Sequence, residues 1–392
     1  MQEGFNSGPQ SRLKHTPPKR GVARQRAQKL CTERAEKISA IFLKCKHRFS
    51  PGKICNRRES LLELSLLRYG NVMFVCDKTI RLLNSRVTFD AASRQELCCV
   101  SHAHADHARP HQLTYATPAT AALMQARLGR LRIESAPFGH PVEIDQYRIS
   151  FHPAGHILGS AQILAEHQGQ RLLYTGDFNL QESATAEKLE IVSADILIME
   201  CTYGHPRYQF PARAELIDRL CGWIHAVLKN GRIPVVIGYA LGKSQEAMKI
   251  LADNGFQLCA HGTIMKLVRV YEKFGHDFGT VEPLRGSSIL EGKVVVVPRH
   301  AELTRVINRI PNKRTLFLSG WAIHEGFKYR CGVDEAIPLS DHADFKGLLE
   351  FVRRVNPKKI FITHGPANFA VYLRQLGYDA QPLRAVKQGE LF

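Results

Sequence analysis

The feature that most constrains this chain is a cluster of histidines at residues 101–107, which read SHAHADH and directly follow an apolar run. Imidazole and carboxylate side chains are the ligand set of zinc and related divalent ions. Two ligands that are separated by a single residue cannot lie on the same face of a helix. In a tight turn, however, the rings of His102 and His104 can face one metal. Asp106 and His107 then project toward a second metal. We therefore expect a buried strand that ends in a metal-binding loop.

Three further side chains of ligand type occur later in the chain, each in a loop setting. His156 lies among small residues in the segment PAGHILGSA, which allows close approach of the backbone to a buried site. Asp177 directly follows an apolar run, where its carboxylate can bridge two metals, and His364 closes another run. Each residue alone is typical of an ordinary loop, and residues 101–107 alone could form a histidine-rich surface loop. Together these residues complete two metal sites.

Short apolar runs alternate with helical patterns from about residue 61, which predicts an α/β chain. Because the motif residues fall at the ends of predicted strands, loops can gather them into one site. The predicted strands cover residues 87–90, 97–101, 172–175, 196–199, 234–237, 294–297, 315–318 and 359–363, and the predicted helices cover residues 118–129, 212–229, 243–254, 263–274, 345–355 and 367–376.

Basic residues are concentrated at the start of the chain. The formal net charge of +18 suits a polyanionic partner such as nucleic acid. Residues 1–60 hold 15 Lys and Arg against 4 Asp and Glu. Their prolines and weak apolar periodicity predict a basic, disordered N-terminal extension. This extension would be either an arm that attracts nucleic acid or a tail without function.

The cysteines and the apolar segments indicate the compartment. The 10 cysteines form no C-x-x-C pair, and several lie in apolar runs, which predicts free thiols in a reducing environment. No apolar stretch reaches the length of a membrane span, and the charged N-terminus lacks the apolar core of a signal peptide. We therefore expect a cytoplasmic protein without a membrane partner, of undetermined oligomeric state.

The order of the ligand candidates resembles the signature of the metallo-β-lactamase superfamily. That resemblance implies an αββα sandwich and two divalent metal ions, Zn²⁺ or alternatively Mn²⁺. It also implies that Asp177 bridges the two ions, and that Asp90 supports the ligands without touching a metal. By the same resemblance, the first ion is held by His102, His104 and His156, and the second by Asp106, His107 and His364.

A long insertion between Asp177 and His364 distinguishes this chain within the superfamily. The flanking segments MECTYG (199–204), LSDHADF (339–345) and THG (363–365) resemble motifs A, B and C of the β-CASP nucleases. The resemblance implies a β-CASP α/β domain that is inserted into a metallo-β-lactamase domain. The implied boundaries are 61–204 and 326–392 for the metallo-β-lactamase domain and 205–325 for the insertion.

Two short segments, SGW at 319–321 and CGVD at 331–334, resemble segments of the bacterial ligase-associated DNA exonucleases, which points to that branch of the β-CASP nucleases. The similarity covers nearly all of residues 61–392 and departs from the pattern mostly in the basic start and in the cysteine-rich stretch 76–99. It implies a DNA exonuclease in DNA end processing or repair, with a DNA ligase or helicase as partner. RNA-processing enzymes share motifs A to C, so an RNA-cleaving endo- or exonuclease is the alternative.

The expected reaction is hydrolysis of phosphodiester bonds through attack by a metal-bound hydroxide, with Asp106, His342 and Glu200 as the catalytic residues. His342 is the candidate general acid, because imidazole can donate a proton to the leaving oxygen near neutral pH. Glu200 would orient His342 and favour its charged form. Asp341 and Asp344 are expected to cap a helix. A small-molecule hydrolase and a catalytically dead binding subunit are further alternatives, which the insertion and the complete ligand set disfavour.

The segment GYALGKS at residues 238–244 superficially resembles a phosphate-binding P-loop. It has three residues between its glycines where that motif has four, so we expect no ATPase activity. Two interpretations remain, a packing turn or a helix start whose amides contact a nucleic-acid phosphate.

Overall fold

The computed structural model describes residues 73–286, 288–301 and 305–383. The chain divides into the units Met1–Ser60 and Leu61–Phe392. The predicted basic extension at residues 1–60 therefore lies outside the described residues, as do the two ends of the second unit. In the described part of the chain, no helix is both long enough and apolar enough to cross a lipid bilayer.

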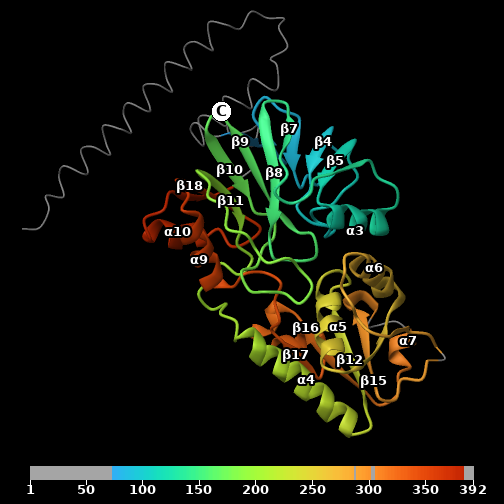
Figure 1. Cartoon of the computed structure of the whole chain (residues 1–392). Helices are drawn as coiled ribbons and strands as arrows, with labels where there is room; N and C mark the ends of the chain where they lie inside the picture. Colours follow the sequence, from blue (N-terminus) through green and yellow to red (C-terminus); the bar gives the residue numbers. More distant parts are fainter. Residues whose placement is uncertain (1–72, 287, 302–304, 384–392) are drawn as a thin grey trace, which may run out of the picture. The chain divides into compact units, whose positions relative to one another are not determined.

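Two sheets, formed by the strands between residues 74 and 200 and by the last two strands of the described chain (359–363 and 380–382), face each other (Figure 1). Their shared core contains apolar side chains from both sheets, and the rings of Phe89 and Tyr174 stack across it with centroids 5.4 Å apart. The first sheet has the order β1 (Phe74–Cys76), β2 (Ile80–Leu82), β3 (Val87–Phe89), β4 (Leu97–Cys99), β5 (Leu113–Ala116) and β6 (Ile133–Ser135). The second has the order β19 (Ala380–Pro382), β18 (Lys359–Thr363), β11 (Ile196–Glu200), β10 (Gln170–Tyr174), β9 (Ala161–His167), β8 (Tyr147–Pro153) and β7 (Val142–Ile144).

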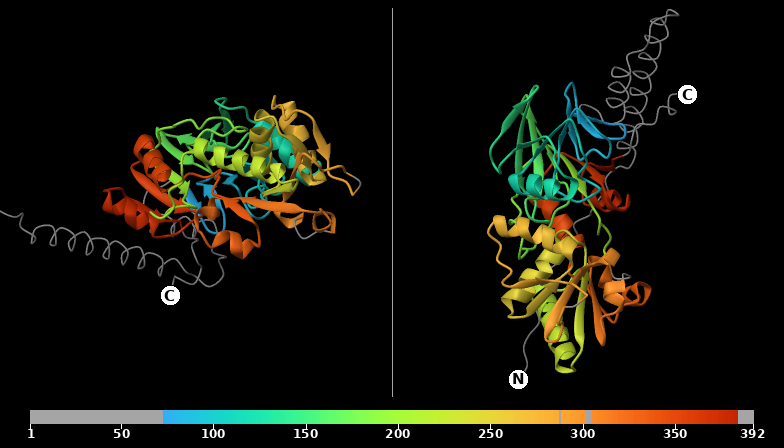
Figure 2. Two further views of the ribbon diagram at one scale, coloured as in Figure 1. Left: turned by 90° about the horizontal axis from the view of Figure 1, so that it is seen from below. Right: turned by 90° about the vertical axis from the view of Figure 1, so that its right-hand side faces the viewer.

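Helices cover the outer faces of both sheets, as the views in Figure 2 show. Helix α3 (Pro118–Leu128) packs through Leu123 and Met124 on the outer face of the first sheet. Helices α9 (Phe345–Val355) and α10 (Phe369–Gln375) pack on the outer face of the second sheet. The predicted αββα sandwich is therefore confirmed.

The central strands have apolar side chains on both faces because each face meets a different core. On β10, Leu172 points into the core between the sheets, and its neighbour Leu173 points toward α9 and α10. Ile198 and Leu197 divide in the same way on β11. A strand that is buried on both faces reads as a continuous apolar run, which is why its period-2 alternation is absent from the sequence.

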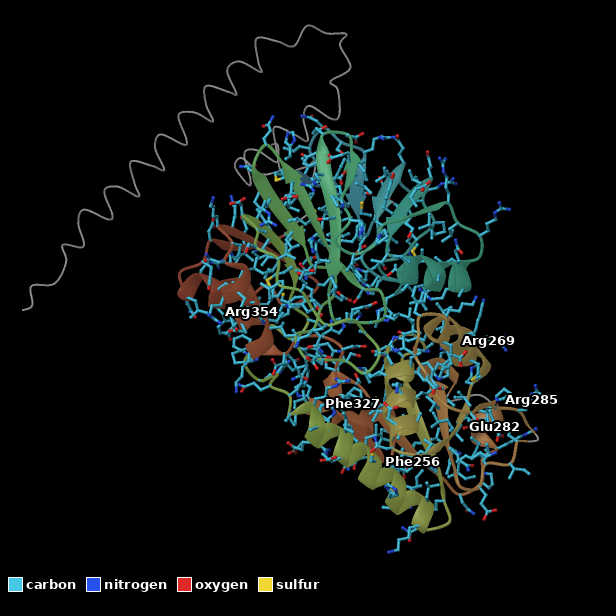
Figure 3. The ribbon with its side chains drawn as sticks, in the orientation of Figure 1. Phe256, Arg269, Glu282, Arg285, Phe327 and Arg354 are labelled. Atoms are coloured by element: carbon cyan, nitrogen blue, oxygen red, sulfur yellow. The ribbon has the colours of Figure 1, made fainter. Side chains whose placement is uncertain are left out.

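A third sheet of six parallel strands forms the inserted α/β unit. Helices α4 (Arg213–Lys229), α5 (Lys243–Asp253) and α6 (Gly262–Lys273) pack on one face, and α7 (Arg305–Asn308) and α8 (Phe327–Cys331) on the other. Figure 3 locates Phe327 within the second of these layers. The strand order is β14 (Val281–Pro283), β13 (Gln257–Ala260), β15 (Lys293–Pro298), β12 (Ile233–Gly238), β16 (Lys313–Leu318) and β17 (Glu335–Ile337).

All eight predicted strands and all six predicted helices are present, with ends that shift by at most two residues. The short 3₁₀ segments Arg299–Ala301 (η1) and Gly320–Ile323 (η2), helices α7 and α8, and several short strands were not predicted. Strand β17 lies beyond residue 325 but pairs with β16, so the sheet of the insertion continues to residue 337. The domain boundaries themselves stay predictions.

Candidate metal centre

Three imidazole rings meet in the loops that follow β4 and β8. The Nδ1 atom of His104 lies 3.1 Å from Nε2 of His102 and 3.0 Å from Nε2 of His156. Zinc–nitrogen bonds of 2.0–2.1 Å in a tetrahedral site would separate such nitrogens by about 3.3 Å. The three rings therefore offer one nitrogen each to a common point at a spacing that fits a metal ion.

The carboxylate of Asp177 lies between these rings and a second group of histidines. Its Oδ2 is 3.5 Å from Nε2 of His102 and 3.4 Å from Nε2 of His107. Its Oδ1 is 3.8 Å from Nδ1 of His364. The side chain is buried, and it belongs to both potential metal-binding groups. A carboxylate in this position can contact two cations at once.

The second group is more open than the first. His107, Asp177 and His364 present ligand atoms to one another, but the side chain of His364 is 48% exposed. Asp106 is 79% exposed, and its Oδ2 lies 3.7 Å from Nε2 of His107. The structure thus gathers six of the seven ligand candidates in compact groups and leaves Asp106 at their margin.

The ring nitrogens of His107, His156 and His104 that point away from the centre have partners, which fix the orientation of these rings. The Nδ1–H of His107 donates to Asp90 at 2.8 Å, and the Nδ1–H of His156 donates to the carbonyl of Asp341 at 2.9 Å. The Nε2–H of His104 donates to the carbonyl of Leu241 at 3.1 Å. The remaining nitrogens are left free to bind a metal.

Asp90 supports several of these groups at once. Its carboxylate also accepts hydrogen bonds from the backbone and hydroxyl of Ser101, at 2.7 and 2.5 Å, and from the hydroxyl of Tyr174 at 2.9 Å. Its φ of 41° and the φ of 45° at His364 lie in the left-handed region. Residues other than glycine adopt that region at a cost of roughly 1–2 kcal/mol, and such strain often occurs at functional sites.

Burial and charge set the protonation of the centre. Burial lowers the pKa of His102 and His156, and lowers that of His104 to about 4, so these rings are neutral at pH 7. Neutral imidazole is the form that binds metals. Burial also opposes the charge on Asp177, but His107 and His342 hold the pKa of this carboxyl well below its usual range. The group of His102, His104 and His156 therefore combines neutral nitrogen ligands with an ionised carboxylate, which fits a divalent cation. In the other group, Asp177 raises the pKa of both His107 and His364.

The buried Glu200 and the partly exposed His342 form a pair beside the centre. The Nδ1 atom of His342 lies 2.8 Å from Oε1 of Glu200, and the ring of His342 lies 4.6 Å from that of His156, centroid to centroid. Backbone and hydroxyl donors of Thr202 hold the other oxygen of Glu200 at 3.1 and 2.5 Å. Burial lowers the pKa of His342, but Glu200 and Asp177 outweigh it and raise the pKa to about 10.

Comparison with known proteins relates this geometry to a family. A family model described as "Zn-dependent metallo-hydrolase RNA specificity domain" matches residues 328–383. A "Probable DNA ligase" of Opitutus terrae is 40% identical over 306 residues, which are 77% of this chain and 30% of that protein. "Endoribonuclease YSH1" of Candida albicans is 27% identical over 60% of this chain and 33% of its own length. An "RNase J-like protein" of Methanocaldococcus jannaschii is 25% identical over 56% of this chain and 64% of its own length.

The family model and these relatives together indicate a β-CASP nuclease of the metallo-β-lactamase fold. It spans about a third of the first two curated relatives and 64% of the third. A solved structure of a protein of unknown function from Enterococcus faecalis V583 covers 75% of this chain and 92% of its own chain, with a TM-score of 0.52 and 12% identity. At that identity the likeness supports the fold alone.

The β-CASP insertion contributes a buried ionic network that the sequence did not reveal. The ammonium group of Lys243 lies 3.0 Å from Glu246 and 3.6 Å from Asp341, and Arg213 pairs with Glu246 as well. The side chains of Lys243 and Glu246 are 1% and 3% exposed. This network connects α5 of the insertion to the loop that carries His342.

The role expected for Asp341 was wrong. Asp344 caps α9 by accepting a hydrogen bond from the backbone of Gly347 at 2.8 Å, as predicted. Asp341 instead faces Lys243, because the loop turns before the helix begins. Lys243 holds the pKa of Asp341 below its usual range against the opposing effect of burial. The only sequence signal was the charge pattern KSQE at the start of α5.

The glycine-containing turn before α5 is a packing turn. The backbone amide of Gly242 donates to the side chain of Gln245 at 2.7 Å, and that of Ser244 donates to Tyr239 at 3.1 Å. Gly242 has a φ of 85°, and a Cβ there would lie 2.3 Å from Ile157 of the sandwich. These amides are therefore occupied within the protein, and glycine is required where the insertion meets the loop that carries His156.

A cavity of about 770 Å³ opens directly beside the metal centre. The sandwich contributes His107, Asp177 and His364 to its lining, and the β-CASP insertion contributes Lys266 and Trp321. His342 lies on the same surface. The cavity therefore joins the candidate metal ligands, the candidate acid and the insertion in one site.

Proposed function

We propose that this chain is a metal-dependent nuclease that hydrolyses phosphodiester bonds, and that its substrate is a DNA end. The observation that carries the proposal is the Glu200–His342 pair beside a group of histidine and aspartate ligands. A nuclease must protonate an alkoxide leaving group, and an imidazole that is held by a buried carboxylate, as His342 is held by Glu200, can supply that proton. The family and the basic charge of +18 support nucleic acid as the substrate.

In this proposal His102, His104 and His156 would hold one divalent ion, and Asp106, His107 and His364 would hold a second. Asp177 would serve both ions, and Asp90 orients His107. We propose Zn²⁺, with Mn²⁺ as the alternative. When bound, such ions lower the pKa of a coordinated water and neutralise charge on the phosphate that is attacked.

The residues of the chain then carry out the proton transfer at the leaving group. Because Nδ1 of His342 is engaged with Glu200, its Nε2–H is the atom that donates to the leaving sugar oxygen. Glu200 keeps the ring charged and fixes its rotation. Cations in the adjacent centre would lower the pKa of His342 from about 10 toward the neutral range, where an acid releases its proton readily.

The choice of DNA rests on the relative named "Probable DNA ligase", whose matched segment is 30% of its length. A nuclease that trims ends would prepare substrates for a ligase, so we propose a DNA ligase as partner and end processing or repair as the setting. The family description "RNA specificity domain" and the relatives named as endoribonucleases favour RNA as the second candidate.

The test uses His342→Ala with labelled DNA and RNA strands that carry either end chemistry. The variant should keep its metal content and its fold but cleave about 10²–10⁴-fold more slowly, which is the usual contribution of a general acid. The defect should shrink on a nitrophenyl phosphodiester, because that leaving group needs no proton. His225→Ala, at an exposed position on α4, is the matched control. Normal cleavage by His342→Ala, or loss of a metal from it, contradicts the proposed role.

A further inference from the structure

One wall of the cavity beside the metal centre is aromatic. Trp321 on η2 and Tyr239 after β12 line the cavity, and they are 37% and 43% exposed. The buried ring of Tyr203, which also lines the cavity, lies 4.9 Å from the indole of Trp321, and Tyr208 meets the indole edge-on at 5.6 Å. An indole that is held by these rings and partly exposed offers a rigid aromatic surface to whatever enters the cavity.

Basic side chains line other parts of the same cavity. Lys266 of α6 and His300 of η1 are exposed, and Arg127 of α3 is half-buried, where it donates to the carbonyl of Ala103. In the described part of the chain, no carboxylate forms a salt bridge with Lys266. The carboxylates of Asp106, Asp177 and Asp341 line the same cavity at the candidate metal centre. The basic side chains, combined with the aromatic wall, match a strand that has phosphates along one side and flat bases along the other.

The candidate acid relates the aromatic wall to the reaction. The ring of His342 lies 6.2 Å from that of Tyr203, the same ring that supports Trp321. In the proposed function His342 protonates the oxygen that leaves with one of the two nucleotides. That nucleotide therefore lies on the side of the cavity where Trp321 is exposed.

We propose that Trp321 is a stacking surface for the base of the leaving nucleotide, so that the enzyme acts on unpaired strand ends. This inference rests on the nuclease function proposed above. A paired base inside a duplex already stacks on its neighbours, so it must unpair before it can contact an indole. Every base has a π-face, so the contact selects unpaired nucleotides without selecting a sequence.

The two tryptophans of the chain, Trp223 and Trp321, provide a direct probe of binding. In the full chain with Trp223→Phe, Trp321 is the only source of indole fluorescence. Rapid mixing with oligothymidylate should quench this fluorescence before cleavage begins. A strand that lacks the base at the stacked end should quench it much less, whereas removal of the base at the other end should have little effect. Oligouridylate tests RNA in the same way.

Affinity gives a second readout. Trp321→Ala should bind oligothymidylate about 5- to 150-fold more weakly, the range that corresponds to the loss of one stacked base. Trp321→Phe should restore most of the affinity, because a phenyl ring also stacks. Removal of the terminal base should weaken binding to the wild type but not to Trp321→Ala. The control is Tyr329→Ala, because Tyr329 is a 77% exposed aromatic of the insertion that does not line this cavity.

The inference is overturned if Trp321 fluorescence is unchanged by either strand, or if both abasic strands quench it as strongly as the intact strand. Equal affinity of Trp321→Ala and the wild type also overturns it. Failure of the proposed function would give a different result. Intact strands would quench the fluorescence of Trp321 without being cleaved, which would support the stacking site and contradict the nuclease function. If fully paired blunt ends are cleaved as fast as single strands, the enzyme has no preference for unpaired ends.

Discussion

The two halves of the candidate metal centre differ in how firmly the protein holds them. His102 and His156 are buried, and the outward nitrogens of His104 and His156 donate to backbone carbonyls of Leu241 and Asp341. In the other half, the side chains of Asp106 and His364 are 79% and 48% exposed. The first half is therefore a preformed pocket, whereas the second is an open edge beside the cavity. We expect one tightly held ion and one that exchanges.

The largest effect is expected where the two halves meet. Asp177→Ala removes a carboxylate that lies between both groups, so it should lower the content of both ions and abolish hydrolysis. Elemental analysis of protein purified without chelator, together with a cleavage assay, measures both effects. Asp218→Ala, an exposed position on α4, should behave as the wild type. Full activity of Asp177→Ala would contradict the proposal that the site binds two metal ions.

The contrast itself is tested by matched histidine substitutions. His104→Ala should remove the tightly held ion, because its nitrogen lies 3.0–3.1 Å from two other ligand nitrogens. His364→Ala should leave that ion in place and lose only the ion that a chelator removes readily. Metal content after timed dialysis against a chelator distinguishes the two variants. If they lose metal at the same rate and to the same extent, the two halves are equivalent.

The next prediction concerns how the insertion supports the buried half. Lys243→Met leaves Asp341 and Glu246 buried with one cation fewer, although Arg213 still pairs with Glu246. Breaking a buried pair from one side costs about 3–5 kcal/mol, and the remaining arginine places the expected loss near the lower limit. Urea denaturation measures the free energy of unfolding. Lys249→Met, which breaks an exposed pair with Asp253, should cost about 0–1 kcal/mol. Equal costs for the two variants would show that the network does not stabilise the fold.

The smallest effect is a change in pH dependence. A general acid must be protonated, so activity should fall as the pH rises through the pKa of His342. Glu200 raises that pKa, and the amide of Glu200→Gln cannot do so. The substitution should therefore move the fall in activity to lower pH, with a smaller loss of rate than in His342→Ala. The pH–rate profile of cleavage measures the shift. An unchanged alkaline limb would mean that another group titrates there.

Much of the centre could be predicted because its residues lie at strand ends within recognisable short motifs. His102, His104, His156 and Asp177 were expected together, and the structure brings them within ligand distance. The pairing of Glu200 with His342 was also expected. In each case the local pattern of a strand followed by a polar loop contained the information, and the resemblance to a family supplied the long-range arrangement.

What could not be predicted depends on contacts between distant segments. Lys243 and Asp341 are separated by most of the insertion, and nothing in their local sequences indicates that they meet. Strands such as β1 and β17 have only three residues, which is too short for a hydrophobic period to be visible. The indole of Trp321 became significant only when the structure placed it in the lining of the cavity that also contains His342.

The hydrogen bond from His104 to the carbonyl of Leu241 has a mechanical consequence. Any rotation of the insertion away from the sandwich would break this bond and free a ligand ring to turn. Opening of the domains and retention of the first ion are then linked equilibria, so each must oppose the other to the same extent. A bound ion would therefore help to hold the insertion against the sandwich, and a nucleic-acid chain would reach the cavity by its end more easily than along its length.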